Sequence, residues 1–554
     1  MIRNIEALAN QTFDILVIGG GIHGAAVARD AALRRMSVAL IERGDFGSGT
    51  SQNSLKIIHG GLRYLPDGDL SRIHTMIRER TAWMRVAPHL VHPLTCLMPT
   101  TETISRSRLM MGAALQINDL LSLDRNSLTD PEKELPSGMV ISQRELSRIL
   151  PGYDLSRSTG AAVWHDAQIY NSERLLLEFI LSAVEAGAHV ANYVEAINLL
   201  QKDSRIIGVQ AKDSQTGQTF DIQCKLVINC AGAWVDRLLE KVHLHSEYAT
   251  SIAINVFLDQ VWSGIAAGLP SEPVYGKPSQ VLFVVPWRDT SMIGTWHIPW
   301  HDEPGAFHLR DAIVQEFLDQ INTIGLPCKF SMNDIKHVTW GFLPVNKADA
   351  HKERVKLTRD GVIIDHQKTH DASGLISILG VKYTTARAVA EKAVDLATSK
   401  LDVKTRKCET HNTPIWGGHI DDFRHFLKQA RAIKDPAVDE KITDHLVYTY
   451  GSRYTDLIEH MKKQPDLMQR VDSELPVTAI DVIHAVQHEM ALRLADVIQR
   501  RTELGATGLP TMATLQKCAD LMGCELGWSA QRQQQEIDSL IQAYPIQGIG
   551  TIPA

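Results

Sequence analysis

The sequence predicts an α/β fold in which a parallel sheet carries a dinucleotide-binding turn, with an inserted antiparallel β domain and a helical C-terminal region. Three observations lead to this prediction. An apolar run at residues 13–18 ends in the glycines of GGGIHG, and a long helical pattern follows. Short β-like runs separated by Gly and Pro fill residues 245–355. Residues 405–554 are mainly helical in pattern and rich in Gln, Arg and Glu.

The glycine-rich turn has the context that a bound dinucleotide requires. Gly19 permits the tight turn, Gly21 lets a pyrophosphate approach the backbone, and Gly24 lets the helix lie close to the sheet. A second strand, residues 37–41, ends in Glu42, whose carboxylate can accept hydrogen bonds from a ribose diol. We therefore expect a Rossmann-like domain, with a purely structural glycine turn as the less favoured alternative. Glu42 argues against NADP but does not choose between NAD and FAD.

Composition limits the class of protein. A chain of 554 residues with 44% hydrophobic and 22% charged residues is expected to form two or three domains with a large buried interior. A net charge of -7 argues against nucleic acid as the partner. Seven scattered cysteines without a CxxC pair indicate reduced thiols in a cytoplasmic protein, and no metal site is expected. We expect neither a signal peptide nor a spanning helix, so any membrane contact would be peripheral.

The segment after the second strand identifies a family. Residues 48–65, SGTSQNSLKIIHGGLRYL, contain small hydroxyl residues and paired glycines that suit a loop crossing a flat ring system. The segment resembles the TSxxSxKLIHGGLRYL motif of the FAD-dependent glycerol-3-phosphate dehydrogenases of the aerobic, membrane-associated type. The resemblance continues through FVVPW (283–287), GVKYTTARAVAEKA (380–393), HLVYTYGSRYTDLI and HAVQHEMALRLADVIQRRT. It therefore touches nearly the whole chain.

This resemblance implies a flavoprotein fold like that of glutathione reductase and D-amino-acid oxidase. Residues 1–404 would form the oxidoreductase domain, and residues 405–554 a helical cap or a homodimer contact. The FAD-binding segments would be about 10–75, 155–240 and 356–404, and the substrate-domain segments about 76–154 and 241–355. The implied activity is hydride transfer from an alcohol carbon to FAD, with electrons passed to quinone at the inner face of the cytoplasmic membrane.

The expected cofactor residues follow from the glycine turn, the loop and the resemblance. A second small pair, Ala231 and Gly232, ends the buried run at residues 226–230 and again allows a close backbone approach. In flavoproteins of this fold Val194 would lie against the adenine. The predicted FAD-binding residues are Gly19, Gly21, Gly24, Glu42, Thr50, Ser51, Ser54, Lys56, His59, Gly61, Leu62, Val194, Ala231, Gly232, Trp234, Gly380, Lys382 and Thr384.

Four residues are candidates for catalysis. Lys382, at the start of a helical pattern, would stabilise the charge that a flavin gathers on accepting hydride, unless it is a surface lysine. His59 is a candidate base for the hydroxyl proton, or it only packs beside the ring. Arg63 has the planar fork that holds a phosphate or carboxylate, although a structural role is the alternative. His297 is a replacement base or anion contact, unless it is a structural strand residue.

The chain departs from the family at the substrate. The family has an arginine in an SGxRPL motif that clamps the substrate phosphate, and Leu343 stands in its place here. The family's KGSH segment corresponds to residues 254–257, which end in Phe257, and its GTTD turn to residues 294–297. We therefore expect an altered pocket for glycerol-3-phosphate, a related polyol phosphate or another small hydroxylated anion. The alternatives are an oxidase or amine-oxidising flavoprotein, and a non-catalytic flavin-binding interaction protein.

Residues 105–121 contain a candidate membrane contact. Arg106 and Arg108 precede a strongly apolar helical pattern, SRSRLMMGAALQINDLL. Two interpretations remain open, a core helix with a solvated start and an interfacial helix that lies on lipid. The second agrees with the peripheral membrane location that the resemblance implies.

Overall fold

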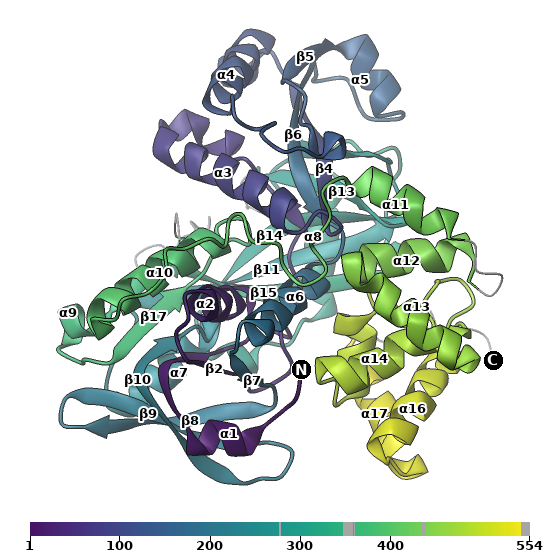
Figure 1. Cartoon of the computed structure of the whole chain (residues 1–554). Helices are drawn as coiled ribbons and strands as arrows, with labels where there is room; N and C mark the ends of the chain where they lie inside the picture. Colours follow the sequence, from purple (N-terminus) through teal and green to yellow (C-terminus); the bar gives the residue numbers. More distant parts are fainter. Residues whose placement is uncertain (276–278, 347–357, 359–360, 434–437, 545–554) are drawn as a thin grey trace.

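The computed structural model describes residues 1–275, 279–346, 358, 361–433 and 438–544. The side chains of Arg63, Pro66 and Asp67 also lie outside this description. Two β-sheets and a C-terminal helical region form the molecule (Figure 1).

The first sheet holds the glycine-rich turn. Its order is β16-β17-β10-β1-β2-β7, and β1 (Thr12–Ile18) lies at the centre between β10 (Thr219–Asn229) and β2 (Val38–Ile41), parallel to both. The outer strands are β7 (His189–Ala191), β17 (Leu375–Leu379) and the antiparallel edge strand β16 (Val362–Asp365), and β8 (Val194–Lys202) and β9 (Arg205–Asp213) extend β10 as a hairpin. Apolar side chains of β1 are buried on both faces, as expected for an inner parallel strand.

Helices cover one face of this sheet. The helix after the glycine turn, α2 (Ile22–Leu33), packs against α6 (Ser172–Glu185) and α10 (Ala386–Leu401). Alanines on α2 and α10 allow the close approach and share one apolar core with the sheet. The shorter helices of the oxidoreductase part are α1 (Ile5–Asn10), α5 (Gln143–Ile149), α7 (Val235–Leu239), α8 (Asp311–Ile321) and α9 (His366–His370).

The second sheet is mostly antiparallel. Its order is β15-β11-β14-β13-β12-β4-β6-β3, with β5 beside β6, and β12 runs parallel to β4. The strands are β3 (Ile57–Ile58), β4 (Val91–Thr100), β5 (Met139–Ser142), β6 (Gly160–Ile169), β11 (Tyr248–Asp259), β12 (Ile265–Pro270), β13 (Val281–Trp287), β14 (Thr290–Trp300) and β15 (His337–Asn346). Strands β3 and β6, whose residues fall in predicted FAD-binding segments, pair within this sheet.

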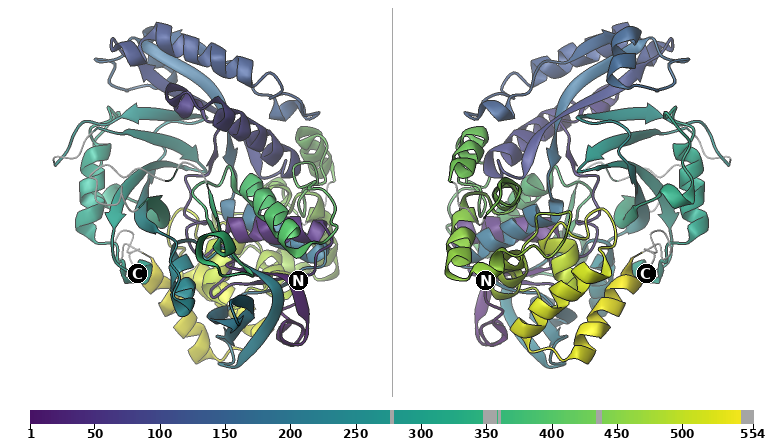
Figure 2. Two further views of the ribbon diagram at one scale, coloured as in Figure 1. Left: turned by 90° about the vertical axis from the view of Figure 1, so that its left-hand side faces the viewer. Right: turned by 90° about the vertical axis from the view of Figure 1, so that its right-hand side faces the viewer.

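A lobe of helices lies at one end of the second sheet (Figures 1 and 2). It contains α3 (Leu70–Val86) and α4 (Arg108–Leu121), which follow the 3₁₀ turns η1 (Leu62–Asp67) and η2 (Ile104–Arg106) respectively. The predicted helix at 105–121 begins later, at Arg108, because the Ser107 side chain accepts a hydrogen bond from the N–H of Met110 at 3.3 Å and caps it. Across the described parts of the chain, no helix has the length and apolar character needed to cross a bilayer.

The C-terminal region has an apolar core of its own. Its helices are α11 (Phe423–Ala432), α12 (Glu440–Tyr450), α13 (Tyr454–Lys463), α14 (Ala479–Glu489), α15 (Leu494–Asp496), α16 (Met512–Leu526) and α17 (Ala530–Ala543). A π-helical turn, η11 (Val497–Arg501), continues α15. In the side views α16 and α17 lie at the opposite end of the molecule from α4 (Figure 2), whereas α11 begins beside the segment after α4, where the N–H of Phe423 donates to Asp130 at 3.1 Å.

Candidate active site

A cavity of about 1980 Å³ opens where the carboxyl ends of β1 and β2 face the second sheet. The glycine turn, the loop at residues 47–62 and the segment at residues 378–384 form one wall. Strands β11, β14 and β15 and helix α4 contribute much of the opposite wall. Because single ligand sites usually measure roughly 300–1,000 Å³, this cavity has room for a large cofactor and a second molecule.

The predicted cofactor residues converge on this cavity. Those that line it are Gly19, Gly21, Glu42, Thr50, Ser51, Ser54, Lys56, His59, Gly61, Leu62, Val194, Ala231, Gly232, Trp234, Gly380, Lys382 and Thr384. Gly24 does not. A Cβ on Gly24 would lie 1.9 Å from the carbonyl oxygen of Gly19, so this glycine allows α2 to approach the turn.

Glu42 is held by backbone donors at one end of the cavity. Its Oε2 accepts the N–H of Gly20 at 2.6 Å, and its Oε1 accepts the N–H of Gly44 at 2.8 Å. Burial raises the pKa of Glu42, against the effect of these two donors. The guanidinium of Arg43 lies 4.3 Å from the ring centre of Trp234 on the same side. This end of the cavity therefore presents the oriented carboxylate of Glu42 and the planar groups of Arg43 and Trp234. Such groups suit an adenosine.

Side-chain hydrogen bonds fix the loop that the sequence predicts to cross the ring system. The hydroxyl of Thr50 donates to the carbonyl of Phe342 at 2.9 Å and accepts the N–H of Phe342 at 3.0 Å. The hydroxyl of Ser51 accepts the N–H of Ile22 at the start of α2, at 3.0 Å. The Nζ of Lys56 donates to Glu173 at 2.9 Å. Lys56 thus lines the cavity while its ammonium is engaged by a carboxylate.

A buried carboxylate that the sequence analysis missed orders the glycines of IIHGGL. Asp166 on β6 accepts the N–H of Gly60 at 2.6 Å and a hydrogen bond from Arg80 at 2.9 Å. The N–H of His59 donates to the Thr384 hydroxyl at 3.3 Å, which ties this loop to the start of α10. No local motif indicates this role of Asp166, because Arg80 and Gly60, the two partners that order the loop, lie 86 and 106 residues away.

Two cations flank one phenol ring in the cavity wall. The Arg72 guanidinium lies 4.0 Å from the ring centre of Tyr64, and the Lys382 ammonium lies 4.6 Å from the same ring. All three residues line the cavity. Of these only Lys382 was predicted. The side chain of the other predicted cation, Arg63, lies outside the described residues, and its backbone belongs to η1.

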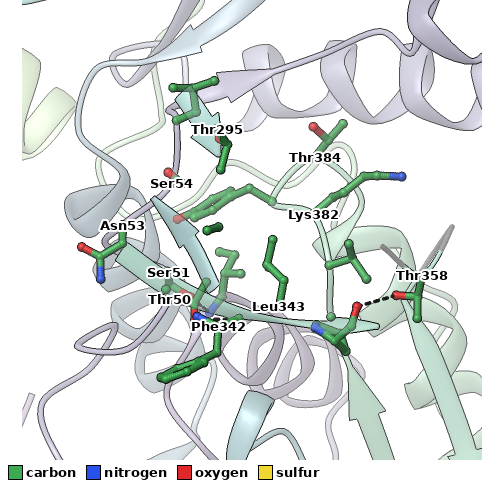
Figure 3. Close-up of a pocket in the computed structure, with 18 of the residues that line it drawn as sticks. Thr50, Ser51, Asn53, Ser54, Thr295, Phe342, Leu343, Thr358, Lys382 and Thr384 are labelled. Atoms are coloured by element: carbon green, nitrogen blue, oxygen red, sulfur yellow. Dashed lines mark hydrogen bonds between the residues drawn. The ribbon is translucent and has the colours of Figure 1, made fainter. Parts of the chain in front are cut away.

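The second sheet supplies the opposite wall. In Figure 3 the Leu343 side chain points into the cavity between Thr295 and Lys382, whereas Phe342 points the other way. His297 lines the cavity too. Asn255, which the sequence analysis missed, accepts the Thr295 hydroxyl at 3.0 Å and donates to the carbonyl of Asn53 at 3.1 Å.

Phe257 is buried against Trp287 and His337 and does not line this cavity. Of the three departures from the family pattern, Leu343 and His297 therefore lie in the cavity wall, while Phe257 lies in the layer behind it.

A buried imidazole inside the glycine motif supports the binding of a polar ligand in this cavity. The Nε2 of His23, the residue before Gly24, is buried and hydrogen-bonds no other described residue. Burial lowers the pKa of His23 to about 4, so the ring is neutral at neutral pH. A Cβ on Gly380 would lie 2.0 Å from the ring of His23, so a glycine is needed there. A polar ligand at the start of α2 would satisfy Nε2.

Comparison with known families agrees with this assignment. The profile of the family described as FAD dependent oxidoreductase matches residues 14–396. A second profile, described as the C-terminal domain of alpha-glycerophosphate oxidase, matches residues 408–533.

Curated relatives match along nearly the whole chain. Glycerol-3-phosphate dehydrogenase of Synechocystis sp. is 30% identical, covering 98% of this chain and 97% of that protein. The mitochondrial glycerol-3-phosphate dehydrogenase of Mesocricetus auratus is 29% identical, covering 95% of this chain and 72% of that protein.

Among solved structures, the glycerol-3-phosphate dehydrogenase from Bacillus halodurans complexed with FAD has a TM-score of 0.77 at 22% identity. It covers 99% of this chain and 98% of that chain. The predicted flavoprotein fold with an inserted β domain and a C-terminal helical domain is thereby confirmed.

Proposed function

The chain belongs to the FAD-dependent oxidoreductase family, in the branch that includes glycerol-3-phosphate dehydrogenases, and we propose that it oxidises the secondary alcohol of a small polyol phosphate or a related anion. The single observation that carries this proposal is the cavity in which the dinucleotide turn, Lys382 and Leu343 meet. One wall has the elements of a flavin site, and the other is formed by the β domain. The substrate would bind between these two walls.

When bound, FAD supplies the two-electron acceptor for the hydride. The chain's own residues must hold the anionic end of the substrate, take the hydroxyl proton and stabilise negative charge on the ring. Lys382 precedes α10, so its ammonium and the helix N-terminus contribute positive potential on the same side. His59 and His297 line the cavity and are the candidate proton acceptors. Arg72 joins Lys382 as a cation for the substrate anion.

Anaerobic reduction of the purified yellow protein tests the proposal. Candidate alcohols with one phosphate or carboxylate are added, and bleaching of the flavin absorbance is followed in a stopped-flow instrument. We expect saturating reduction by at least one alcohol of this class, and glycerol-3-phosphate should saturate only at high concentration because Leu343 offers no hydrogen bond to its phosphate. If no phosphorylated or carboxylated alcohol reduces the flavin, the proposed substrate class is wrong.

An oxidase is the second candidate, favoured by the match of residues 408–533 to the alpha-glycerophosphate oxidase C-terminal domain. The two candidates differ in the acceptor rather than in the alcohol. After reduction by substrate, an oxidase would return its electrons to oxygen rapidly and form peroxide. A dehydrogenase would reoxidise slowly in air and rapidly with a short-chain quinone.

We further propose that the acceptor is a membrane quinone that reaches the cavity beside α4. Met110, Met111 and Ile117 of this helix line the cavity, facing Phe283 and Met98 of the second sheet. The same helix and its flanks expose large apolar side chains outward. These are Ile104, Leu109, Leu120 and Leu123, and the cavity-lining Met110 and Ile117 are partly exposed as well. Such a helix suits the surface of a bilayer, and the predicted contact at residues 105–121 would place the apolar part of the cavity next to lipid.

A further inference from the structure

The loop at residues 45–56, here called the cofactor loop, forms much of the cavity wall. The residues from Gly47 to Lys56, except Gln52, line the cavity. The N–H of Gly47 donates to the carbonyl of Gly20 at 3.0 Å, so the loop is joined to the glycine turn. Gly47 has a φ of 79°, a left-handed conformation that favours glycine. The shape of the flavin site therefore depends on how this loop is held.

The first residue of the loop is fixed by two arginines. The carboxylate of Asp45 is fully buried. Its Oδ2 accepts hydrogen bonds from Nε of Arg500 at 2.6 Å and from Nη1 of Arg501 at 2.7 Å. Its Oδ1 accepts Nη2 of Arg501 at 2.8 Å and Nδ2 of Asn192 at 3.0 Å. Both oxygens are thus satisfied in a bidentate arrangement, which is geometrically specific.

A second contact reaches further along the loop. The Nη1 of Arg500 donates to the Oε1 of Gln52 at 3.3 Å. The same guanidinium donates through Nη2 to Asp496 at 2.7 Å. Arg500 therefore connects the cofactor loop to the end of α15.

The arginines belong to the C-terminal domain. They lie in the π-helical turn η11, and Arg501 also donates to the carbonyl of Glu489 at 3.0 Å. Among the described residues that line the main cavity, none lies beyond Thr384. The C-terminal domain thus determines the position of the cofactor loop without lining that cavity.

We propose that Arg500 and Arg501 are positioning residues for FAD, so that cofactor binding and the order of the C-terminal turn at residues 497–501 are coupled. Without the arginines, Asp45 would be a buried charge lacking its counterions, and the loop would move to hydrate it. FAD binding would then have to return the cofactor loop to its original position, and this cost lowers the affinity of the protein for FAD. Coupling is reciprocal, so bound FAD should order the arginine turn in return.

The first experiment measures FAD affinity in Arg500→Gln and Arg501→Gln. Apo-protein is titrated with FAD, whose fluorescence is quenched on binding, and circular dichroism confirms that the variants are folded. We expect dissociation constants raised about tenfold or more, within the usual range of allosteric coupling. Arg431→Gln, which removes an exposed ion pair to Asp444 in the same domain, is the matched control and should stay near wild type. Folded variants that bind FAD as tightly as the control would overturn the proposal.

The second experiment uses the unmodified protein, so it holds even if a variant fails to fold. Hydrogen exchange is compared in the apo and FAD-bound forms by mass spectrometry. We expect slower exchange on FAD binding at residues 45–56 and also at residues 494–502, with α16 unchanged as an internal reference. Protection of the cofactor loop without protection of the arginine turn would contradict the coupling. Neither measurement uses substrate, so both are independent of the proposed reaction.

Discussion

Leu343 is the residue at which the cavity departs most directly from the family pattern. It lies on β15, pairs across to Ser251 on β11, and points into the cavity (Figure 3). An aliphatic side chain there excludes water and offers no donor to an anion. Two cations of the cavity, Arg72 and Lys382, flank Tyr64 away from this position. We therefore expect recognition of the substrate anion to be shifted toward these two cations.

The substitution Leu343→Arg tests this account. A new guanidinium facing the cavity would add charged hydrogen bonds to a phosphate, each contributing about 1.5–3 kcal/mol. We expect the KM for glycerol-3-phosphate to fall by about tenfold or more, since roughly 1.4 kcal/mol corresponds to tenfold. Initial rates with an artificial electron acceptor measure it. Leu343→Met is the control for volume, and equal KM values for the two variants would show that position 343 does not face the phosphate.

Single residues could be predicted where the chemistry is local. The glycine turn and Glu42 belong to one continuous strand–turn–helix–strand unit, and the segment around Lys382 carries a motif of the resembled family. The structure brings all three to one cavity. Asn255 and Asp166 carry no such signal. Their partners are contributed by other strands and loops, so only the three-dimensional pairing shows that they order the site.

At the scale of elements, α4 presents two apolar faces. One lines the cavity, and the other exposes side chains such as Leu109 and Leu120, which are 82% and 66% exposed. The sequence alone left a core helix and an interfacial helix as alternatives, because both are apolar. Leu115 is the residue of α4 that is fully packed, which separates this helix from a core helix. The basic start at Arg106 and Arg108 adds attraction for anionic headgroups.

Replacing Leu109 and Leu120 together by Gln should weaken membrane binding. Burying a leucine side chain contributes about 1.5–3 kcal/mol, so the double variant should lose roughly a hundredfold or more in partition coefficient. Flotation with vesicles of anionic phospholipid measures the bound fraction. Leu509→Gln, an exposed leucine outside the lobe, serves as the control. Unchanged flotation of the double variant would exclude α4 as the membrane contact.

At the scale of the whole molecule, buried charges join the oxidoreductase part to the C-terminal domain. Arg174 on α6 donates to Glu489 at the end of α14 at 2.5 Å and to Glu178 at 3.1 Å, and all three side chains are fully buried. This junction could not be predicted from the sequence, because Arg174 and Glu489 are 315 residues apart. In its own segment, each has the pattern of a charged residue on an exposed helix surface. The apolar periodicity predicts the helices, whereas the charge pairs determine how the two parts dock.

The Glu489 carboxylate should make stability depend on pH in a definite direction. Burial alone would raise the pKa of Glu489, but Arg174, His484 and Arg501 outweigh it and hold the pKa well below the ordinary value of 4.5. A carboxylate with a depressed folded pKa stabilises the protein fully above its ordinary pKa, and this contribution is lost as pH falls through the folded value.

We therefore expect Glu489→Gln to lower the free energy of unfolding by about 3–5 kcal/mol at neutral pH, because Arg174 loses a buried counterion. The difference in free energy of unfolding between variant and wild type should stay constant between about pH 6 and 8. It should shrink below about pH 4.5, where the ionised carboxylate begins to contribute less to the stability of the wild type. Urea unfolding followed by tryptophan fluorescence, with FAD in excess, measures the free energy of unfolding of the variant and of wild type at each pH. Glu525→Gln, an exposed carboxylate that accepts a hydrogen bond from Gln487, provides the control and should show neither effect. A deficit that persists unchanged into the acid range would mean that the junction depends on the shape of residue 489 rather than on its charge.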